Sequence, residues 1–278
     1  MIALKEHVYK LGGRGLRYRL KTSRVHDLYW MIANRERFNR RRREISFYRS
    51  LLHGFRKGDL ILDVGANDGG KTDVFLKLGA HVIAVEPDEQ NQEILAERFL
   101  KYRLLPQPVV VVGKAVSDSV SVEKMWIDGP GSALNTFSVK WIETLKRHPK
   151  HHVHSAAALD FCTSKHIETT TLEQLFAAYG VPFFLKVDVE GYEVNVLRGM
   201  HHPVPYISFE VNLPEFRSEG LECIEFLARL RHGTFNYAID CEVLMLDRWL
   251  YAEEFSKVLM NVQDESIEVF WKAPVGLV

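Results

Sequence analysis

The feature that most constrains the fold is a short apolar segment that runs directly into a glycine-rich turn. Residues 59–66 read DLILDVGA, and the turn continues through Asn67 and Asp68 to Gly69 and Gly70. A short apolar run bounded by turn residues is typical of a buried strand. Glycine lets the following backbone approach a ligand closely and present free N–H groups at a helix start. The segment therefore predicts a strand, a ligand-binding turn and a helix.

Strand and helix patterns alternate after this turn. Helices are expected at residues 71–79, 88–102, 169–180, 192–200 and 221–233, with Asp88 and Thr171 as N-caps. Apolar strand patterns cover residues 81–87, 109–118, 182–191 and 206–212, and further strands around a short helix are expected from Phe235 to Trp271. Such alternation predicts an α/β fold with a mostly parallel sheet and helices on both faces.

Residues 1–57 are predicted to form a basic helical extension to a domain that spans residues 58–278. The extension holds sixteen Lys and Arg against four Asp and Glu, although the formal net charge of the chain is zero. The run Arg40 to Arg43 is interpreted as a solvated helix face, and an anionic partner is the alternative. Leu28, Tyr29, Ile32 and Phe38 are expected to form the core-facing stripe of this extension.

Residues 128–167 are predicted to be irregular, because they contain Gly129, Pro130, Gly131, Pro149 and several histidines. Long irregular loops in compact domains are often functional lids. The histidines lack the cysteine partners of a zinc site, so no metal site is predicted there.

Acidic side chains are predicted at the ends of three strands. Asp63 precedes the glycine-rich turn, and Glu86 follows the second strand, where a carboxylate can accept hydrogen bonds from both hydroxyls of a ribose. Asp188 and Glu190 follow a later strand and would share a face if the chain stayed extended. Two buried carboxylates so close together are costly unless they serve a ligand, a metal or a hydrogen-bond network. Mg²⁺ is the alternative ligand of this pair.

The segments DVGANDGGKT, VEP and LKVDVEGYEVNVLRGM, together with AVSD, GSALNTFS and TTTLEQL, resemble the FkbM family of S-adenosylmethionine (SAM)-dependent methyltransferases over residues 58–215. The resemblance implies a Rossmann-like class I methyltransferase fold with a seven-stranded sheet. It also implies SAM as the cofactor and a hydroxyl acceptor on a small molecule, sugar or glycan. Tyr192 and Glu173 depart from the residues common in the family.

The resemblance assigns the cofactor-binding residues by position. These are Asp63, Gly65, Ala66, Asn67, Gly69 and Thr72 around the turn, Glu86 and Pro87 at the ribose, Ser117 and Asp118 at the adenine, and Asp188 beside the methyl group. Asp188, Glu190 and Glu210 are the candidates for a catalytic base that takes the proton of the acceptor hydroxyl.

Two other functions are the alternatives to methyl transfer. An NAD-dependent oxidoreductase would share the turn and Glu86, but Asn67 in place of glycine and the acidic Asp188–Glu190 segment argue against it. A non-enzymatic binder of anions or nucleic acid would use the Arg40–Arg43 run. No nucleic-acid partner is expected, whereas peripheral membrane contact is left open. Because no secretory signal and no apolar stretch of about 18 residues is present, a cytoplasmic protein is expected.

Overall fold

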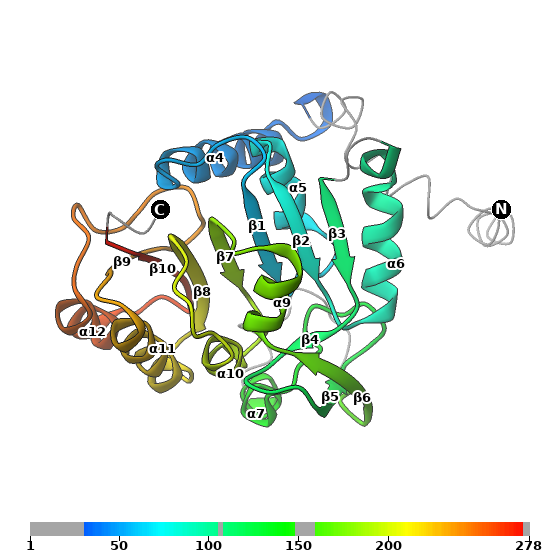
Figure 1. The fold of residues 1–278 in the computed structure, drawn as a ribbon. Helices are drawn as coiled ribbons and strands as arrows, with labels where there is room; N and C mark the ends of the chain where they lie inside the picture. The colour runs from blue at the N-terminus through cyan, green and yellow to red at the C-terminus, as the bar shows by residue number, and fades with distance from the viewer. Residues whose placement is uncertain (1–30, 105–107, 148–158, 275–278) are drawn as a thin grey trace, which may run out of the picture.

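The computed structural model describes residues 31–104, 108–147 and 159–274. Its centre is a seven-stranded sheet in the order β3-β2-β1-β7-β8-β10-β9 (Figure 1). Five neighbouring strands are parallel: β3 (Val109–Val112), β2 (His81–Val85), β1 (Leu60–Val64), β7 (Phe184–Val187) and β8 (Tyr206–Asn212). β10 (Ser266–Lys272) lies antiparallel between β8 and β9 (Thr234–Ala238). The predicted Rossmann-like, mostly parallel α/β fold is therefore confirmed.

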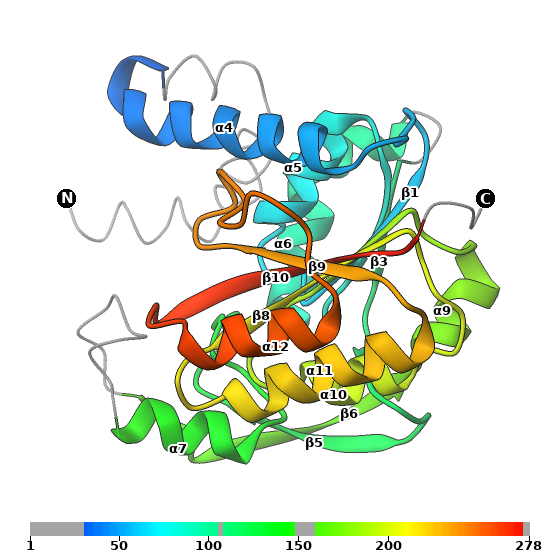
Figure 2. The ribbon, with the colours of Figure 1, turned by 90° about the vertical axis from the view of Figure 1, so that its left-hand side faces the viewer.

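Helices cover both faces of this sheet (Figure 2). One face carries α4 (Arg35–Leu51), α5 (Gly70–Leu78) and α6 (Glu89–Arg98). The 3-10 helix η2 (Leu100–Leu104) comes directly after α6 in the chain. The other face carries α9 (Leu172–Tyr179), α10 (Glu193–Arg198) and α11 (Arg217–Leu230), with α12 (Ala252–Asn261) beside α11. The helices from 71, 88 and 171 begin close to where the sequence predicts, and the Asp88 and Thr171 side chains accept the expected capping hydrogen bonds.

The alternation of side chains along each strand divides the apolar residues into two cores. On β2, Val82 and Ala84 join the core under α4, α5 and α6, whereas Ile83 and Val85 join the opposite core. This is the two-residue period of a strand that is buried on both faces. Asp63 on β1 and Lys186 on β7 break the pattern, since both are charged and at most 1% exposed. Such charges are kept in a core only where partners compensate for lost water.

A second, three-stranded sheet lies beyond the carboxyl ends of the parallel strands (Figure 1). It contains β4 (Ala115–Val116), β6 (Thr163–Thr170) and β5 (Val122–Ile127). Because α7 (Val139–Arg147) and the start of β6 fall within residues 128–167, the prediction of one irregular stretch there is wrong. In β6 only the last two residues are buried, so the strand has no alternating apolar pattern. It is stabilised instead by its backbone pairing with β5. Residues 128–138 are irregular as predicted.

The described part of the N-terminal extension, residues 31–57, contains α4, which packs against α5 through its last turns. Phe47, Tyr48 and Leu51 are buried there, whereas Ile32 of the expected core-facing stripe is 78% exposed. That prediction is wrong for Ile32, which precedes α4, and Phe38 is half-buried and belongs to neither core. Leu28 and Tyr29 lie outside the described residues. None of the helices in the described ranges combines the length and the apolar character that a bilayer crossing requires.

Candidate active site

A cleft opens between the carboxyl ends of β1, β2 and β7 and the small sheet. Its volume is about 690 Å³ when the open space at its mouth is included. β1 has β2 on one side and β7 on the other, so the chain order reverses at this point of the sheet. Ligands of open α/β sheets bind outside the strand ends at such a reversal.

The turn after β1 forms the floor of the cleft. Gly65 has a φ of 77°, and a Cβ atom there would overlap the carbonyl oxygen of Asp188. The backbone N–H groups of Gly65 and Ala66 both donate to the Val85 carbonyl, at 3.0 and 3.1 Å. Asn67 has a φ of 48°, a left-handed conformation that asparagine tolerates better than most residues. Glycine at 65 therefore follows from the close approach of this turn to the segment after β7, and asparagine at 67 follows from its left-handed conformation.

Glu86 connects this turn to the start of α6. Its Oε2 accepts the N–H of Asn67 and its Oε1 accepts the N–H of Asp88, each at 2.8 Å. Burial raises the pKa of Glu86 to about 7, although both N–H groups favour the ionised form. Each carboxylate oxygen has a second lone pair for a ligand, and Glu86 lines the cleft. It can therefore accept hydrogen bonds from two hydroxyls of a ribose.

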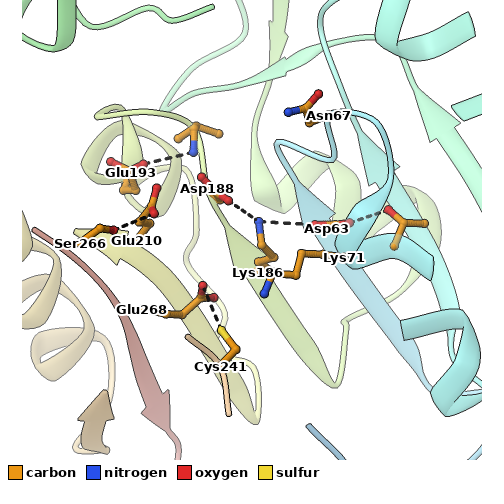
Figure 3. Close-up of polar contacts among 12 residues, drawn as sticks. Asp63, Asn67, Lys71, Lys186, Asp188, Glu193, Glu210, Cys241, Ser266 and Glu268 are labelled. Atoms are coloured by element: carbon orange, nitrogen blue, oxygen red, sulfur yellow. Dashed lines mark hydrogen bonds and ion pairs between the residues drawn. The ribbon is translucent and has the colours of Figure 1, made fainter. Parts of the chain in front are cut away.

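Lys186 supplies a buried positive charge below the cleft (Figure 3). Its Nζ lies 2.9 Å from Asp188 Oδ2 and 3.8 Å from Asp63 Oδ1. Burial opposes ionisation of Asp188, but the Lys186 ammonium outweighs it and holds the pKa of Asp188 below its usual value. Asp63 is fully buried and also accepts from the Thr72 hydroxyl at 2.5 Å. Asp188 thus presents a negative charge to the cleft at neutral pH.

Three carboxyl groups converge beside the end of β7. Each of Asp188, Glu190 and Glu210 has an oxygen within 4.8 Å of the others. Burial and the neighbouring carboxylates raise the pKa of Glu190 and Glu210 well above the usual value. The condition for Asp188 and Glu190 to share an extended face is not met, because β7 ends at Val187 and Glu190 has a φ of 54°. This turn, rather than a strand, brings the carboxyl groups together, and three such oxygen ligands could also hold a divalent cation.

Residues 128–138 form the roof of the cleft, and Asp88 holds them in place. Its carboxylate accepts the Gly131 N–H at 3.0 Å and the Asn135 side-chain N–H at 3.2 Å. The Thr136 hydroxyl donates to the Glu190 carbonyl at 2.8 Å. The roof is therefore tied both to the start of α6 and to the acidic segment after β7.

The structure brings only part of the predicted site into the cleft. The predicted residues that line it are Gly65, Asn67, Glu86, Pro87, Asp188 and Glu190. The others lie outside the lining: Asp63, Ala66, Gly69, Thr72, Ser117, Asp118 and Glu210. Ser117 is fully buried with its hydroxyl 3.2 Å from that of Tyr192, whereas Asp118 is exposed.

Several cleft residues were not predicted as ligand contacts from the sequence. They are Val64, Val85, Asn91, Lys114, Ala115, Val116, Met125, Ser132, Ala133, Asn135, Val189 and Tyr192. Two signals were present, since the roof belongs to the predicted functional lid and Tyr192 departs from the residue common in the family. Met125 could not be predicted as a cleft residue, because the small sheet that positions it was not predicted.

The family of the chain follows from comparison with known proteins. The sequence model of the methyltransferase FkbM domain matches residues 63–237, which include the turn, Glu86 and the acidic segment. The chain belongs to the FkbM methyltransferase family. The match extends from the end of β1 into β9, so it contains every strand end that contributes to the cleft.

Individual relatives of this FkbM chain are distant. An FkbM methyltransferase from Methylobacillus flagellatus superimposes with a TM-score of 0.49 at 15% identity, over 82% of this chain and 47% of its own. An O-methyltransferase from Thermotoga maritima gives 0.42 at 13% identity, over 84% of this chain and 65% of its own. A chloroplastic ribosomal RNA small subunit methyltransferase from Arabidopsis thaliana is 34% identical over 58 residues, which are 20% of this chain and 17% of that protein.

Proposed function

We propose that this chain transfers the methyl group of SAM to a hydroxyl oxygen of a small molecule, sugar or glycan. The observation that carries the proposal is the convergence on one cleft of Glu86, the turn at Gly65 and the anionic Asp188. Glu86 suits the ribose of a nucleoside, and the turn lets the methionyl part lie close to the backbone. The sulfonium is a cation, so Asp188 and its acidic neighbours attract it at short range.

The chemistry of the transfer requires alignment and a proton acceptor. The acceptor oxygen forms a bond to the methyl carbon while the carbon–sulfur bond breaks, and the sulfonium becomes a neutral thioether. Holding the two reactants in line supplies much of the rate enhancement. The hydroxyl proton passes to the cluster of Asp188, Glu190 and Glu210, where Asp188 and Glu190 border the cleft and Glu210 lies behind them.

The cofactor is tested by isothermal titration of the full chain with SAM and with NAD. Binding of SAM without binding of NAD supports the proposal, and the reverse result would establish the oxidoreductase alternative. The acceptor class is then tested with SAM that carries a labelled methyl group and a panel of sugars, glycans and small alcohols. An O-methyl ether is expected in the product by mass spectrometry and NMR, and a methylated nitrogen or carbon would contradict it.

The base is tested with Asp188→Asn and Glu190→Gln. Each substitution keeps the size of the side chain and removes its ability to take a proton. A loss of about 10²-fold or more in turnover with SAM still bound is expected for the residue that acts as the base. Full turnover in both variants would exclude both residues as the base.

A further inference from the structure

The adenine side of the cleft lacks the polar partners that the sequence suggests. Ser117 is buried against Tyr192, Asp118 is exposed, and neither lines the cleft. Asn91, in the first turn of α6, does line it and is 2% exposed. Its Oδ1 is buried with no hydrogen-bond donor in the described structure. A buried acceptor without a donor costs stability, so this atom requires an explanation.

The other polar side chains around Asn91 already have partners. Both oxygens of Glu86 accept backbone N–H groups, and the Asn135 amide donates to Asp88 and to the Gly129 carbonyl. The Ser132 hydroxyl donates to Asp128 at 2.8 Å, and Lys114 pairs with Glu168 at 3.0 Å. Asn91 differs from them, because its buried Oδ1 receives no hydrogen bond within the described structure.

The position of Asn91 suits the base of a nucleoside whose ribose rests on Glu86. Asn91 follows Glu86 by five residues, and its N–H donates to Asp88, which fixes the start of α6. α6 packs against β3, and the chain after β3 contributes Ala115 and Val116 to the same cleft. With Pro87, Val85 and Met125, these residues give the region apolar walls for the faces of a ring.

We propose that Asn91 Oδ1 accepts a hydrogen bond from the 6-amino group of the cofactor's adenine. An asparagine amide is a suitable partner for adenine, whose amino group donates beside a ring nitrogen that accepts. Gly131 lies over the amide with a φ of 72°, and a Cβ there would be 3.3 Å from Asn91 Oδ1. The roof therefore encloses this contact. The inference rests on the proposed function, since it needs an adenosyl cofactor in the cleft.

The test uses two ligands and two variants of the full chain. S-adenosylhomocysteine and its analogue without the 6-amino group are titrated into the unmodified protein, Asn91→Ala and Glu93→Ala. Glu93 is exposed on the same helix and is the control. The unmodified protein and Glu93→Ala are expected to bind the analogue about tenfold more weakly. In Asn91→Ala the two ligands should bind with equal affinity, so that the discrimination is lost.

Each outcome decides the inference. Equal binding of both ligands by the unmodified protein, or discrimination retained in Asn91→Ala, overturns the assignment of Asn91 and leaves the cofactor assignment intact. No binding of S-adenosylhomocysteine overturns both. If Asn91 had only a structural role, Asn91→Ala would lower Tm and weaken the binding of both ligands equally. If Asn91 Oδ1 is an unpaired buried acceptor, its removal should leave Tm unchanged or raise it.

Discussion

Lys186 lies directly opposite Asp63 in the register of β7 and β1, and its ammonium reaches Asp188 at 2.9 Å. The sheet register therefore places one cation between the carboxylate of Asp63, which precedes the glycine-rich turn, and the carboxylate of Asp188, which faces the cleft. Figure 3 shows Lys186 between these two partners. The same pairing that builds the sheet thus also fixes the charge of Asp188.

Replacement of Lys186 by methionine should leave the buried carboxylate of Asp63 and the cleft-facing carboxylate of Asp188 without their cation. A broken buried pair costs about 3–5 kcal/mol, and this loss of unfolding free energy is expected in urea denaturation. Lys257→Met is the control, because Lys257 forms an exposed ion pair with Glu253. The side chain of Lys257 is 74% exposed and that of Glu253 is 88% exposed. The control should change stability by less than about 1 kcal/mol. Equal stabilities of the two variants would contradict the role of Lys186.

Gly65→Ala should abolish cofactor binding, whereas Gly58→Ala should not. Both glycines have positive φ, 77° and 97°, so alanine costs about 1–2 kcal/mol of backbone strain at each position. Only at Gly65 does the new Cβ meet the Asp188 carbonyl, and nothing lies within 4 Å at Gly58. Titration with SAM and thermal unfolding of both variants check this. Similar SAM affinity in the two variants would show that the close approach at Gly65 is not needed.

Much of the fold could be predicted from local patterns, because its central strands are apolar and short. β1 and β2 end in turns marked by Gly65 and Pro87, and the Asp88 and Thr171 caps mark two helix starts. The small sheet could not be predicted, since the exposed side chains of β6 carry no apolar period and its partner β5 comes from a distant segment. Such pairing depends on tertiary contacts rather than on local propensity.

The strand-end residues of the site could be predicted from the sequence. Which of their side chains border the cleft could not be predicted. Glu86 and Asp188 follow from their places after β2 and β7. Asp63 precedes Gly65 in the same motif but points away from the cleft toward Thr72, because successive residues of a strand face opposite sides. Asn91 gave no signal, since only the roof and the end of β3 show that its amide borders a cleft.

Cofactor affinity should depend on the ionisation of Glu86. Its pKa is raised to about 7, so the ionised carboxylate that we propose as the ribose ligand is depleted as pH falls through that value. SAM affinity measured by titration from pH 8 to pH 5.5 is expected to fall. Glu86→Gln should bind SAM more weakly at pH 8 and lose the part of the pH dependence due to Glu86. An unchanged pH profile in Glu86→Gln would exclude this group.

The same carboxyl group affects stability in the opposite direction. Its folded pKa lies above the unfolded value of 4.5, so the favourable contribution is complete below pH 4.5 and is lost as pH rises through about 7. A shift of that size corresponds to about 3 kcal/mol. Glu86→Gln lacks this loss, so its unfolding free energy relative to the unmodified protein should increase from pH 4.5 to 7. A constant difference between the two proteins would contradict the raised pKa.

The arginine run of α4 is predicted to act within the chain. Arg41 pairs with the buried Asp73 and donates to the Gly70 carbonyl at 3.2 Å, whereas the Arg40–Asp240 pair is exposed on both sides. Arg41→Met should therefore destabilise the protein by about 2 kcal/mol or more, and Arg40→Met by less than about 1 kcal/mol. Chemical denaturation of both variants checks the difference. Equal effects would favour the solvated interpretation of the whole run.

The acidic cluster is expected to work without a bound metal. Lys186 compensates the charge of Asp188, and the raised pKa values of Glu190 and Glu210 let these groups hold protons near neutral pH. The cluster therefore reaches charge balance with groups of the chain itself, and a divalent cation would have to displace those protons. Treatment with EDTA should leave Tm and SAM affinity unchanged, and added Mg²⁺ should not raise Tm. A Tm increase with Mg²⁺ that disappears in Glu210→Gln would show instead that the three carboxylates bind the cation.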